Sequence, residues 1–312
     1  MIASLLRAGS RTSLGQMRKR ATVFAIAATL VVIAGQLNPC DAADITIERG
    51  TIDAVTISPD GSTIVAAIYG WGEMEDDPTI VRWWNWSGTD SIWHFPGDRV
   101  GALAWAADGS LLVGGKTDDR SPVVPWWKLG AGGEVRAACK GQPRGPSERM
   151  SRGVASITEL TTGQVVTGGT DQTLAVWDGC SPTWLNAETC CRNEQSILVT
   201  ARGKEFETYG EGVWQDKQGG YYKDMGPRLW SPSPWKAVPI QASLPHDAAT
   251  KATAIGADCT AKIDASGHVS VAGAHPWTTS IGGDDWRILA ASRDCKTIAA
   301  ATEGRIVKVT PP

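Results

Sequence analysis

The chain has 312 residues, of which 42% are hydrophobic, and a formal net charge of −3. Five basic residues and one acidic residue give the first 43 positions a charge of +4, so the remainder carries −7. A protein that neutralises phosphates needs a basic surplus, and this balance therefore argues against nucleic acid as a partner. The remainder is long and apolar enough to bury a substantial core.

The N-terminal segment has the order of a secretory signal peptide. A basic triplet at 18–20 precedes an uncharged apolar run at 21–37, and small residues follow, so cleavage is expected after Ala42 or Ala43. Met17 is an alternative start. Cleavage predicts a periplasmic or extracellular protein with no membrane span. The apolar run approaches the roughly 20 residues that cross a bilayer, so an uncleaved leader would anchor the protein in a membrane.

A unit of strand, turn and strand recurs through the rest of the chain. Each copy has two short apolar runs around a turn that contains Gly or Cys, which is typical of a β-hairpin. Equivalent turn positions are separated by 36 to 56 residues, close to the 40 to 45 of a four-stranded propeller blade. Six segments carry the unit: 55–67, 103–115, 157–169, 196–210, 252–271 and 288–309. Their equivalent turn positions are Gly61, Gly109, Gly163, Gly203, Cys259 and Cys295.

A third strand rich in aromatic residues is expected in four of the units. The segments are IVRWWNW (80–86), VVPWW (123–127), TLAVWD (173–178) and EGVWQD (211–216). This order of strands and turns, with Trp177-Asp178 as a WD dipeptide, resembles the repeat of a WD40 β-propeller. The resemblance covers most of residues 44–312 and implies an all-β fold of six, or alternatively seven, blades. It also implies that Asp171 and Trp177 form half of the polar network found in many family members.

The two ends of the propeller region are expected to pair. The last unit ends after its third strand, RIVKV (305–309), and an isolated alternating segment, DITIE (44–48), precedes the first unit. An open ring would leave unpaired strand edges on its first and last blades. We therefore expect Ile45 and Ile47 to complete the last blade.

Two pairs of adjacent tryptophans indicate sheets that are covered on both faces. Neighbouring strand residues point to opposite faces, so Trp83 and Trp84, and likewise Trp126 and Trp127, need both faces covered. Blades in a ring provide this, and the pairs are expected in the core. Four other tryptophans lie beside Gly or Pro and are candidates for an exposed ligand or partner surface: Trp71, Trp230, Trp235 and Trp277.

Residues 215–250 do not follow the repeat clearly. The segment combines two strand-like pieces with many prolines, which are excluded from central strands but allowed at edges. It is expected to be either an insertion or a degenerate seventh blade.

Six cysteines follow the leader, an even number that suggests disulfides in an exported protein. They are Cys139, Cys180, Cys190, Cys191, Cys259 and Cys295. Sequence does not select among the pairings. Cys180 is close enough in sequence to pair with Cys190 or Cys191. Cys259 and Cys295 occupy matching turns and can bridge only if their Cα atoms lie within about 7 Å.

No motif for a catalytic, metal or cofactor site stands out. The four histidines lack a second ligand at metal-binding spacing, and neither HExxH nor GxSxG occurs. The leading hypothesis is therefore a non-enzymatic protein-interaction scaffold in the cell envelope. The alternatives are a propeller that binds a small ligand or glycan through exposed tryptophans, and a hydrolase or lyase on a propeller scaffold.

Overall fold

The computed structural model describes 14 stretches of the chain. These are 44–70, 79–85, 90–97, 99–116, 124–141, 153–169, 174–185, 197–210, 214–215, 221–222, 228–240, 250–255, 259–283 and 285–312. Their regular elements are all β-strands. Within these stretches, no helix has the length and apolar character needed to cross a membrane. The predicted leader, Trp71, Asp171, Cys190 and Cys191 lie outside the described residues.

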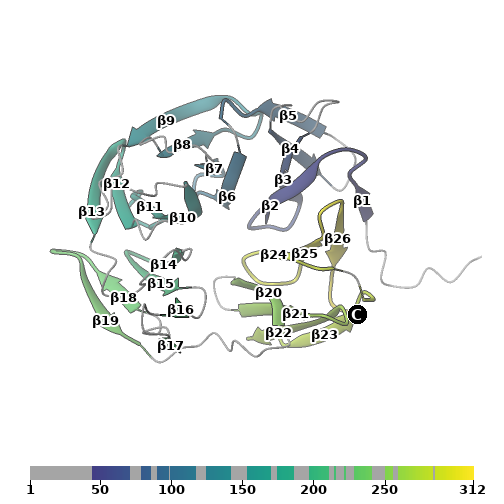
Figure 1. The fold of residues 1–312 in the computed structure, drawn as a ribbon. Helices are drawn as coiled ribbons and strands as arrows, with labels where there is room; N and C mark the ends of the chain where they lie inside the picture. The colour runs from purple at the N-terminus through teal and green to yellow at the C-terminus, as the bar shows by residue number, and fades with distance from the viewer. Residues whose placement is uncertain are drawn as a thin grey trace, which may run out of the picture. The chain divides into compact units, whose positions relative to one another are not determined.

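The strands form six four-stranded antiparallel sheets arranged around a centre as the blades of a propeller (Figure 1). Blade one contains β2 (Thr51–Ile57), β3 (Thr63–Tyr69), β4 (Ile80–Asn85) and β5 (Asp90–His94). Blade two contains β6 (Arg99–Trp105), β7 (Leu111–Lys116), β8 (Val124–Leu129) and β9 (Val135–Gly141). Blade three contains β10 (Val154–Glu159), β11 (Val165–Gly169), β12 (Leu174–Asp178) and β13 (Ser181–Leu185).

The second half of the ring follows the same plan. Blade four contains β14 (Ile197–Arg202), β15 (Glu205–Gly210), β18 (Arg228–Ser231) and β19 (Lys236–Pro239). Blade five contains β20 (Thr250–Ile255), β21 (Cys259–Asp264), β22 (His268–Gly273) and β23 (Trp277–Ser280). Blade six contains β24 (Ile288–Ala291), β25 (Ile298–Ala301), β26 (Arg305–Val309) and β1 (Asp44–Thr46). The six-bladed prediction is confirmed.

Blade four corrects one strand assignment. EGVWQD was expected to supply its third strand, but Trp214–Gln215 forms β16, which among the described strands pairs with β17 (Tyr221–Tyr222) in a separate two-stranded sheet. The third strand is β18, where Trp230 pairs with Phe206 of β15. The error arose because a hairpin is inserted between the second and third strands. The described part of 215–250 therefore completes blade four and does not form a seventh blade.

The chain ends close the ring as expected. β1 pairs antiparallel with β26, with Ile45 opposite Ile306. The side chain of Ile47 is 7% exposed and belongs to a buried cluster with residues of blades six and one. Strand pairing and apolar packing thus join segments that lie at opposite ends of the propeller sequence.

Hydrophobic clusters fill five of the six joints between blades. Trp84 packs in the joint of blades six and one, whereas Trp83 and Trp127 pack in the joint of blades one and two. Trp126 packs on the far side of blade two, against Trp177 of blade three, with ring centroids 6.0 Å apart. The doubled tryptophans are therefore buried on both faces of their sheets, as predicted. Among the described residues, no such cluster joins blades four and five.

Candidate interaction surface

The antiparallel blades give the propeller two unlike faces. Connections between first and second strands, and between third and fourth strands, leave at one end, which we call the turn face. None of them is longer than the segment Ser292–Thr297 between β24 and β25. The other connections leave at the opposite end, the loop face. Seven of these are longer than any on the turn face: 70–79, 117–123, 142–153, 186–196, 211–227, 240–249 and 281–287.

The turns between first and second strands share one geometry. Gly61, Gly109 and Gly163 have φ values of +73°, +76° and +81°, in the left-handed region that glycine enters without steric cost. Their N–H groups donate to Ser58, Ala106 and Leu160 respectively, at 2.8 to 3.1 Å. The recurrent Gly in the sequence is therefore explained by the backbone conformation of the turn.

Neighbouring turns bind one another across the blade boundaries. The Arg293 N–H donates to the Pro59 carbonyl at 3.1 Å, which links blades six and one. The Thr161 N–H donates to the Gly203 carbonyl at 2.9 Å, which links blades three and four. These backbone contacts hold adjacent turns at fixed separations.

An ion-pair network ties blades two and three at the same face. Lys128 Nζ lies 2.8 Å from Glu159 Oε1 and 3.1 Å from Asp108 Oδ2. The other Glu159 oxygen accepts the Ala107 N–H at 2.7 Å. Burial lowers the pKa of Lys128, but its two carboxylate partners outweigh burial and raise it. Burial likewise raises the pKa of Asp108, but hydrogen bonds from Ser110 and Lys128 outweigh it and lower the pKa to about 2.

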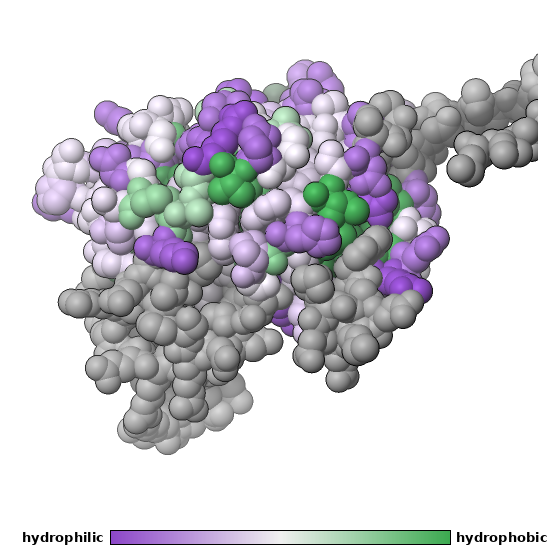
Figure 2. Space-filling view, turned by 90° about the horizontal axis from the view of Figure 1, so that it is seen from above, coloured by the Kyte–Doolittle hydropathy of each residue, from purple (hydrophilic) through white to green (hydrophobic). Residues whose placement is uncertain are grey.

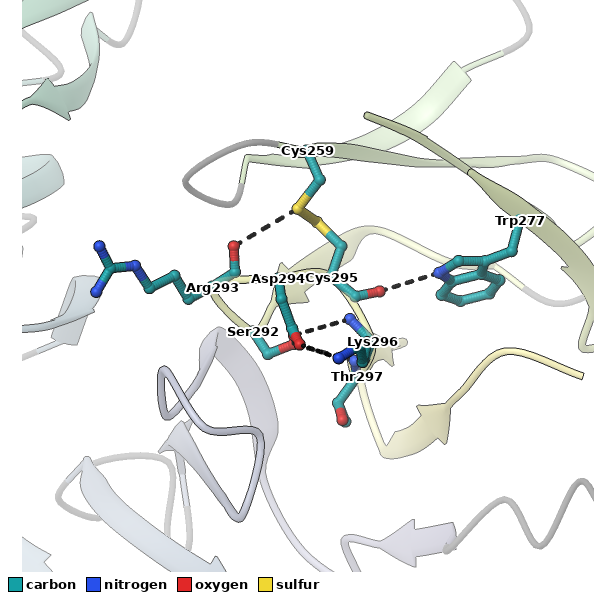
Figure 3. The surroundings of a disulfide bond; sticks show 8 residues. All are labelled: Cys259, Trp277, Ser292, Arg293, Asp294, Cys295, Lys296 and Thr297. Carbon is teal, nitrogen blue, oxygen red and sulfur yellow. Dashed lines mark hydrogen bonds and ion pairs between the residues drawn. A yellow bond between two sulfur atoms is a disulfide. The ribbon is translucent and has the colours of Figure 1, made fainter. Parts of the chain in front are cut away.

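A disulfide joins blades five and six at the turn face (Figure 3). Cys259 and Cys295 have Cα atoms 6.1 Å apart, within bridging range. Cys295 occupies the position taken by Gly in other turns and has φ +51°, while its carbonyl accepts the Trp277 indole N–H at 3.1 Å. The expectation that Cys259 and Cys295 occupy matching turns was wrong for Cys259, which is the first residue of strand β21.

A second disulfide joins blades two and three. Cys139 of β9 is bonded to Cys180, which follows β12, and the Cα atoms are 4.9 Å apart. Cys180 therefore does not pair with Cys190 or Cys191, the partners that proximity in sequence had suggested.

At the loop face, Asp53 and Arg99 connect the inner strands of blades one and two. Arg99 Nε donates to one Asp53 oxygen at 2.9 Å and a second guanidinium nitrogen binds the other oxygen, while the guanidinium lies 4.5 Å from the Tyr69 ring centroid. Asp53 lies in a β-bulge of β2, and a bulge re-aims a side chain out of the ladder. Equivalent irregularities occur in β6, β10 and β20. The bulge thus places this carboxylate within reach of the next blade.

The outer wall offers small apolar areas. Figure 2 shows hydrophobic residues on one side of the molecule as separate patches among hydrophilic ones. The large hydrophobic side chains described as exposed are Ile92, Val135 and Val238, at 45%, 52% and 50%, and they lie on the outer strands β5, β9 and β19. A broad apolar patch would mark an interface. These three positions stand on three different blades and do not form one.

Comparison with known proteins shows that this chain is similar to solved structures. No protein-family model matches the sequence, and no curated protein matches it either. The crystal structure of the RRP9 WD40 repeats is similar with a TM-score of 0.54 and 15% identity, covering 87% of this chain and 98% of that one. The structure of U3-55K is similar with a TM-score of 0.54 and 14% identity, covering 87% and 99%. The chain has the WD40 β-propeller fold.

Two blades contain the same hydrogen-bonded pair, a buried tryptophan and a threonine. The Trp177 indole N–H donates to Thr167 Oγ1 at 2.8 Å in blade three, and Trp230 donates to Thr208 Oγ1 at 2.9 Å in blade four. Asp171, expected to act with Trp177, lies outside the described residues. Neither threonine was predicted from the sequence. Each lies on the second strand of its blade, two residues after the register partner of the tryptophan, which is Val165 in blade three and Phe206 in blade four.

The tryptophans predicted to be exposed are largely covered in this WD40 propeller. Trp230 is 4% exposed and stacks on Phe206, so that prediction was wrong. Trp235 is half-buried and also contacts Phe206, at 5.2 Å between centroids. Trp277 is half-buried against the Cys295 turn. Of these three, only Trp235 lies in a turn, whereas Trp230 is part of β18 and Trp277 begins β23, so proline and glycine nearby in sequence did not identify exposed side chains.

The described residues contain no group of three or more His, Cys, Asp and Glu side chains placed to hold a metal ion. Several of their charged side chains form ion pairs between strands or blades. The surface that the propeller presents is therefore best described by its two faces, one built of short, mutually bonded turns and one bearing the longer connections.

Proposed function

We propose that this protein is an exported, non-enzymatic propeller that acts as a protein-interaction scaffold in the cell envelope, with its loop face as the main binding surface. The observation that carries the proposal is the asymmetry of the two faces. Longer connections on a rigid framework are where binding residues are concentrated in proteins. WD40 propellers in general mediate protein interactions, which supports the same conclusion at the level of the fold.

The turn face supports this assignment by stiffening the framework. Bonds between neighbouring turns, the Lys128 network and two inter-blade disulfides restrict relative movement of the blades. Connections held on such a framework lose less conformational freedom when a partner binds, which favours affinity.

Two independent features support export. The basic triplet and apolar run of the first 43 residues have the order of a signal peptide. Cys139–Cys180 and Cys259–Cys295 are disulfides between blades, and structural disulfides persist in oxidising compartments such as the periplasm or the extracellular space.

The proposal is tested by affinity capture from the cell envelope of a strain that produces the tagged full chain. Replacing 142–152 or 186–196 by a short Gly-Ser linker should abolish capture of a specific partner. Arg293→Ala and Lys204→Ala, both exposed on the turn face, serve as controls and should retain it. Loss of the partner only in the turn-face variants, or recovery of the protein solely from the cytoplasm, would overturn the corresponding half of the proposal.

A further inference from the structure

The two disulfides between described residues differ in how exposed their cysteines are. In the bond between blades two and three, Cys180 is exposed in the turn that joins β12 to β13, whereas Cys139 of β9 is 1% exposed. A Cβ placed on the adjacent Gly179 would meet nothing within 4 Å, so the space beside Cys180 is open. A dissolved thiol can therefore reach this bond from the side of Cys180.

The disulfide between blades five and six is more enclosed. Cys295 is 0% exposed, and the half-buried Cys259 packs against the hydrophobic cluster of that joint. Figure 3 shows the Arg293 carbonyl on one side of the bond and Trp277 on the other, and the Arg293 oxygen lies 3.7 Å from Cys259 Sγ. Exchange of a disulfide depends on access to its sulfur atoms, so this bond should react more slowly.

Cys139 anchors the outer strand of blade two. It is the one buried side chain among those described in β9. The other described side chains of the strand are exposed or half-buried: Val135, Arg136, Ala137, Ala138 and Lys140. A segment with few buried contacts opens at a low free-energy cost. The disulfide to Cys180 therefore fixes a strand that is otherwise held by its backbone pairing with β8 and by the burial of one small side chain.

The rest of this joint does not depend on β9. Trp126 of β8 packs against Trp177 of β12 with ring centroids 6.0 Å apart. Lys128 of β8 lies 2.8 Å from Glu159 of β10. Breaking the disulfide would leave these contacts between blades two and three in place. Its loss should therefore loosen β9 without opening the ring.

We propose that the Cys139–Cys180 disulfide is a thiol-exchange site, at which a small thiol bonds to Cys180 and frees β9. The incoming thiolate attacks Cys180 Sγ, and the bond to Cys139 breaks with its electron pair passing to Cys139 Sγ, which takes up a proton from water. The Gly179 carbonyl, 3.8 Å from Cys139 Sγ, is then available as the acceptor of the new thiol.

A second molecule of the small thiol completes the reduction. Its thiolate attacks the sulfur of the first molecule in the mixed disulfide, which releases Cys180 as a thiolate. Two small thiols are thereby oxidised to one disulfide, and the protein disulfide is reduced to two thiols. The same steps in reverse, with the small disulfide as the oxidant, restore the bond and fix β9 again.

The freed strand leads directly to the loop face. β9 ends at Gly141 and is followed by the connection at 142–153. Exchange at Cys180 would thus alter the anchoring of one connection of the proposed binding surface, and this consequence alone rests on the proposed function. The exchange and the release of β9 need no partner, so they are tested separately from it.

Reduced glutathione is the probe for the exchange site, applied to the full chain with both disulfides formed. N-ethylmaleimide in denaturant caps free thiols at successive times, and peptide mapping by mass spectrometry locates each product. Cys139–Cys180 should be reduced at least about ten-fold faster than Cys259–Cys295, with the first glutathione on Cys180 and the maleimide on Cys139. Glutathione found first on Cys139, or reduction of Cys259–Cys295 at an equal or higher rate, overturns the proposal.

The Cys190→Ser/Cys191→Ser variant is the control for attack from within the chain. It keeps all four cysteines of the two disulfides, and added glutathione is then the attacking thiol. Mixed-disulfide formation at Cys180 should proceed at the original rate. Loss of this product in the variant would mean that Cys190 or Cys191 makes the attack, which contradicts exchange with a small thiol.

Hydrogen exchange tests the release of the strand. After selective reduction, the amides of β9 that bond to β8 should exchange at least about ten-fold faster, while those of β12 keep their protection. Cys139→Ala/Cys180→Ser, which lacks the bond without any added thiol, should behave in the same way. Unchanged exchange in β9, or equal acceleration in β9 and β12, overturns the local release of this strand.

Discussion

The backbone N–H of Ile47 donates to the Gly304 carbonyl at 2.8 Å, joining the start of the propeller to its last blade. This bond continues the pairing of β1 with β26 and lies beside a second link, in which Arg305 binds the Asp44 carboxylate at 2.8 Å. Arg305 and Asp44 are each 42% exposed, so their ion pair contributes at most about 1 kcal/mol. Burial of Ile47 is the stronger candidate for stabilising the closure.

Ile47→Ala should therefore destabilise the propeller. Ile47 is 7% exposed, and truncation of a buried Ile typically costs about 2 to 5 kcal/mol. The same substitution at Ile92, which is 45% exposed on the outer strand β5, should change the free energy of unfolding by about 0.5 kcal/mol or less. Urea denaturation of both variants measures the difference. Equal effects would mean that β1 does not hold the ring closed.

Gly61→Ala and Gly109→Ala should destabilise the protein to different extents, although the two glycines have similar positive φ values. A Cβ on Gly61 would lie 2.6 Å from Thr297 Oγ1 of blade six, whereas nothing lies within 4 Å of a Cβ on Gly109. Gly109→Ala should cost about 1 to 2 kcal/mol for the left-handed conformation alone. Gly61→Ala adds a steric clash between blades and should lower the thermal midpoint further, as differential scanning calorimetry would show. A smaller effect at Gly61 would contradict the close packing of these turns.

Sequence periodicity predicted the ring because the same turn conformation recurs in successive blades and favours the same residue type each time. The left-handed position at Gly61, Gly109 and Gly163 is set by the backbone, and the doubled tryptophans need two covered faces, so both signals are readable without tertiary information. Closure by Ile45 and Ile47 was predictable for a related reason, since the last unit lacked one strand.

The predictions that were wrong concern features that depend on contacts between residues distant in sequence. EGVWQD has the composition of a third strand, but β15 pairs with Arg228–Ser231, which follows an inserted hairpin. Composition alone does not show which of these two segments pairs with β15. Cys295 adopts a glycine conformation within a disulfide-linked turn, whereas Cys259 lies in a strand. The partner of Cys180 comes from the neighbouring blade, which sequence proximity does not indicate.

Thr167→Val should destabilise blade three by leaving the Trp177 indole N–H without its acceptor. Trp177 is 1% exposed, and an unsatisfied buried donor costs about 1 to 3 kcal/mol. Thr278→Val, on the exposed part of β23, is the control and should be near neutral. Adding Trp177→Phe to Thr167→Val removes the donor as well. The double-mutant cycle should then show that the two substitutions cost less together than the sum of their separate effects, and strict additivity would contradict the pairing.

The stability lost on removing the disulfide between blades five and six should depend on which residue replaces Cys295. The 36-residue separation gives an upper value of about 4 kcal/mol for loss of the cross-link. Since Cys295 has φ +51°, the Cys259→Ser/Cys295→Gly variant should be about 1 kcal/mol more stable than Cys259→Ser/Cys295→Ser. Chemical denaturation of the two variants makes the comparison. Equal stability would show that the turn relaxes out of the left-handed conformation when the bond is absent.

Asp108 should make stability depend on pH in the acidic range. Burial raises the pKa of Asp108, but hydrogen bonds from Ser110 and from Lys128 outweigh it and bring the pKa to about 2, below the ordinary value of 3.8. The folded state thus binds fewer protons than the unfolded state between these values. The resulting stabilisation is complete above about pH 4 and is lost as the pH falls towards about 2. Its size is small, because the Asp108 side chain is 50% exposed and solvent screens the interaction.

Asp108→Asn removes this titration. The difference in free energy of unfolding between the original protein and the variant should be largest above about pH 4 and should shrink towards about pH 2, where Asp108 becomes protonated. Ser110→Ala is the companion variant. It removes a hydrogen bond to the carboxylate, raises the Asp108 pKa, and should move the pH dependence to higher pH while keeping its sign. Urea titrations at a series of pH values measure both, and a difference between original protein and Asp108→Asn that stayed constant with pH would show that the carboxylate is not stabilised by these contacts.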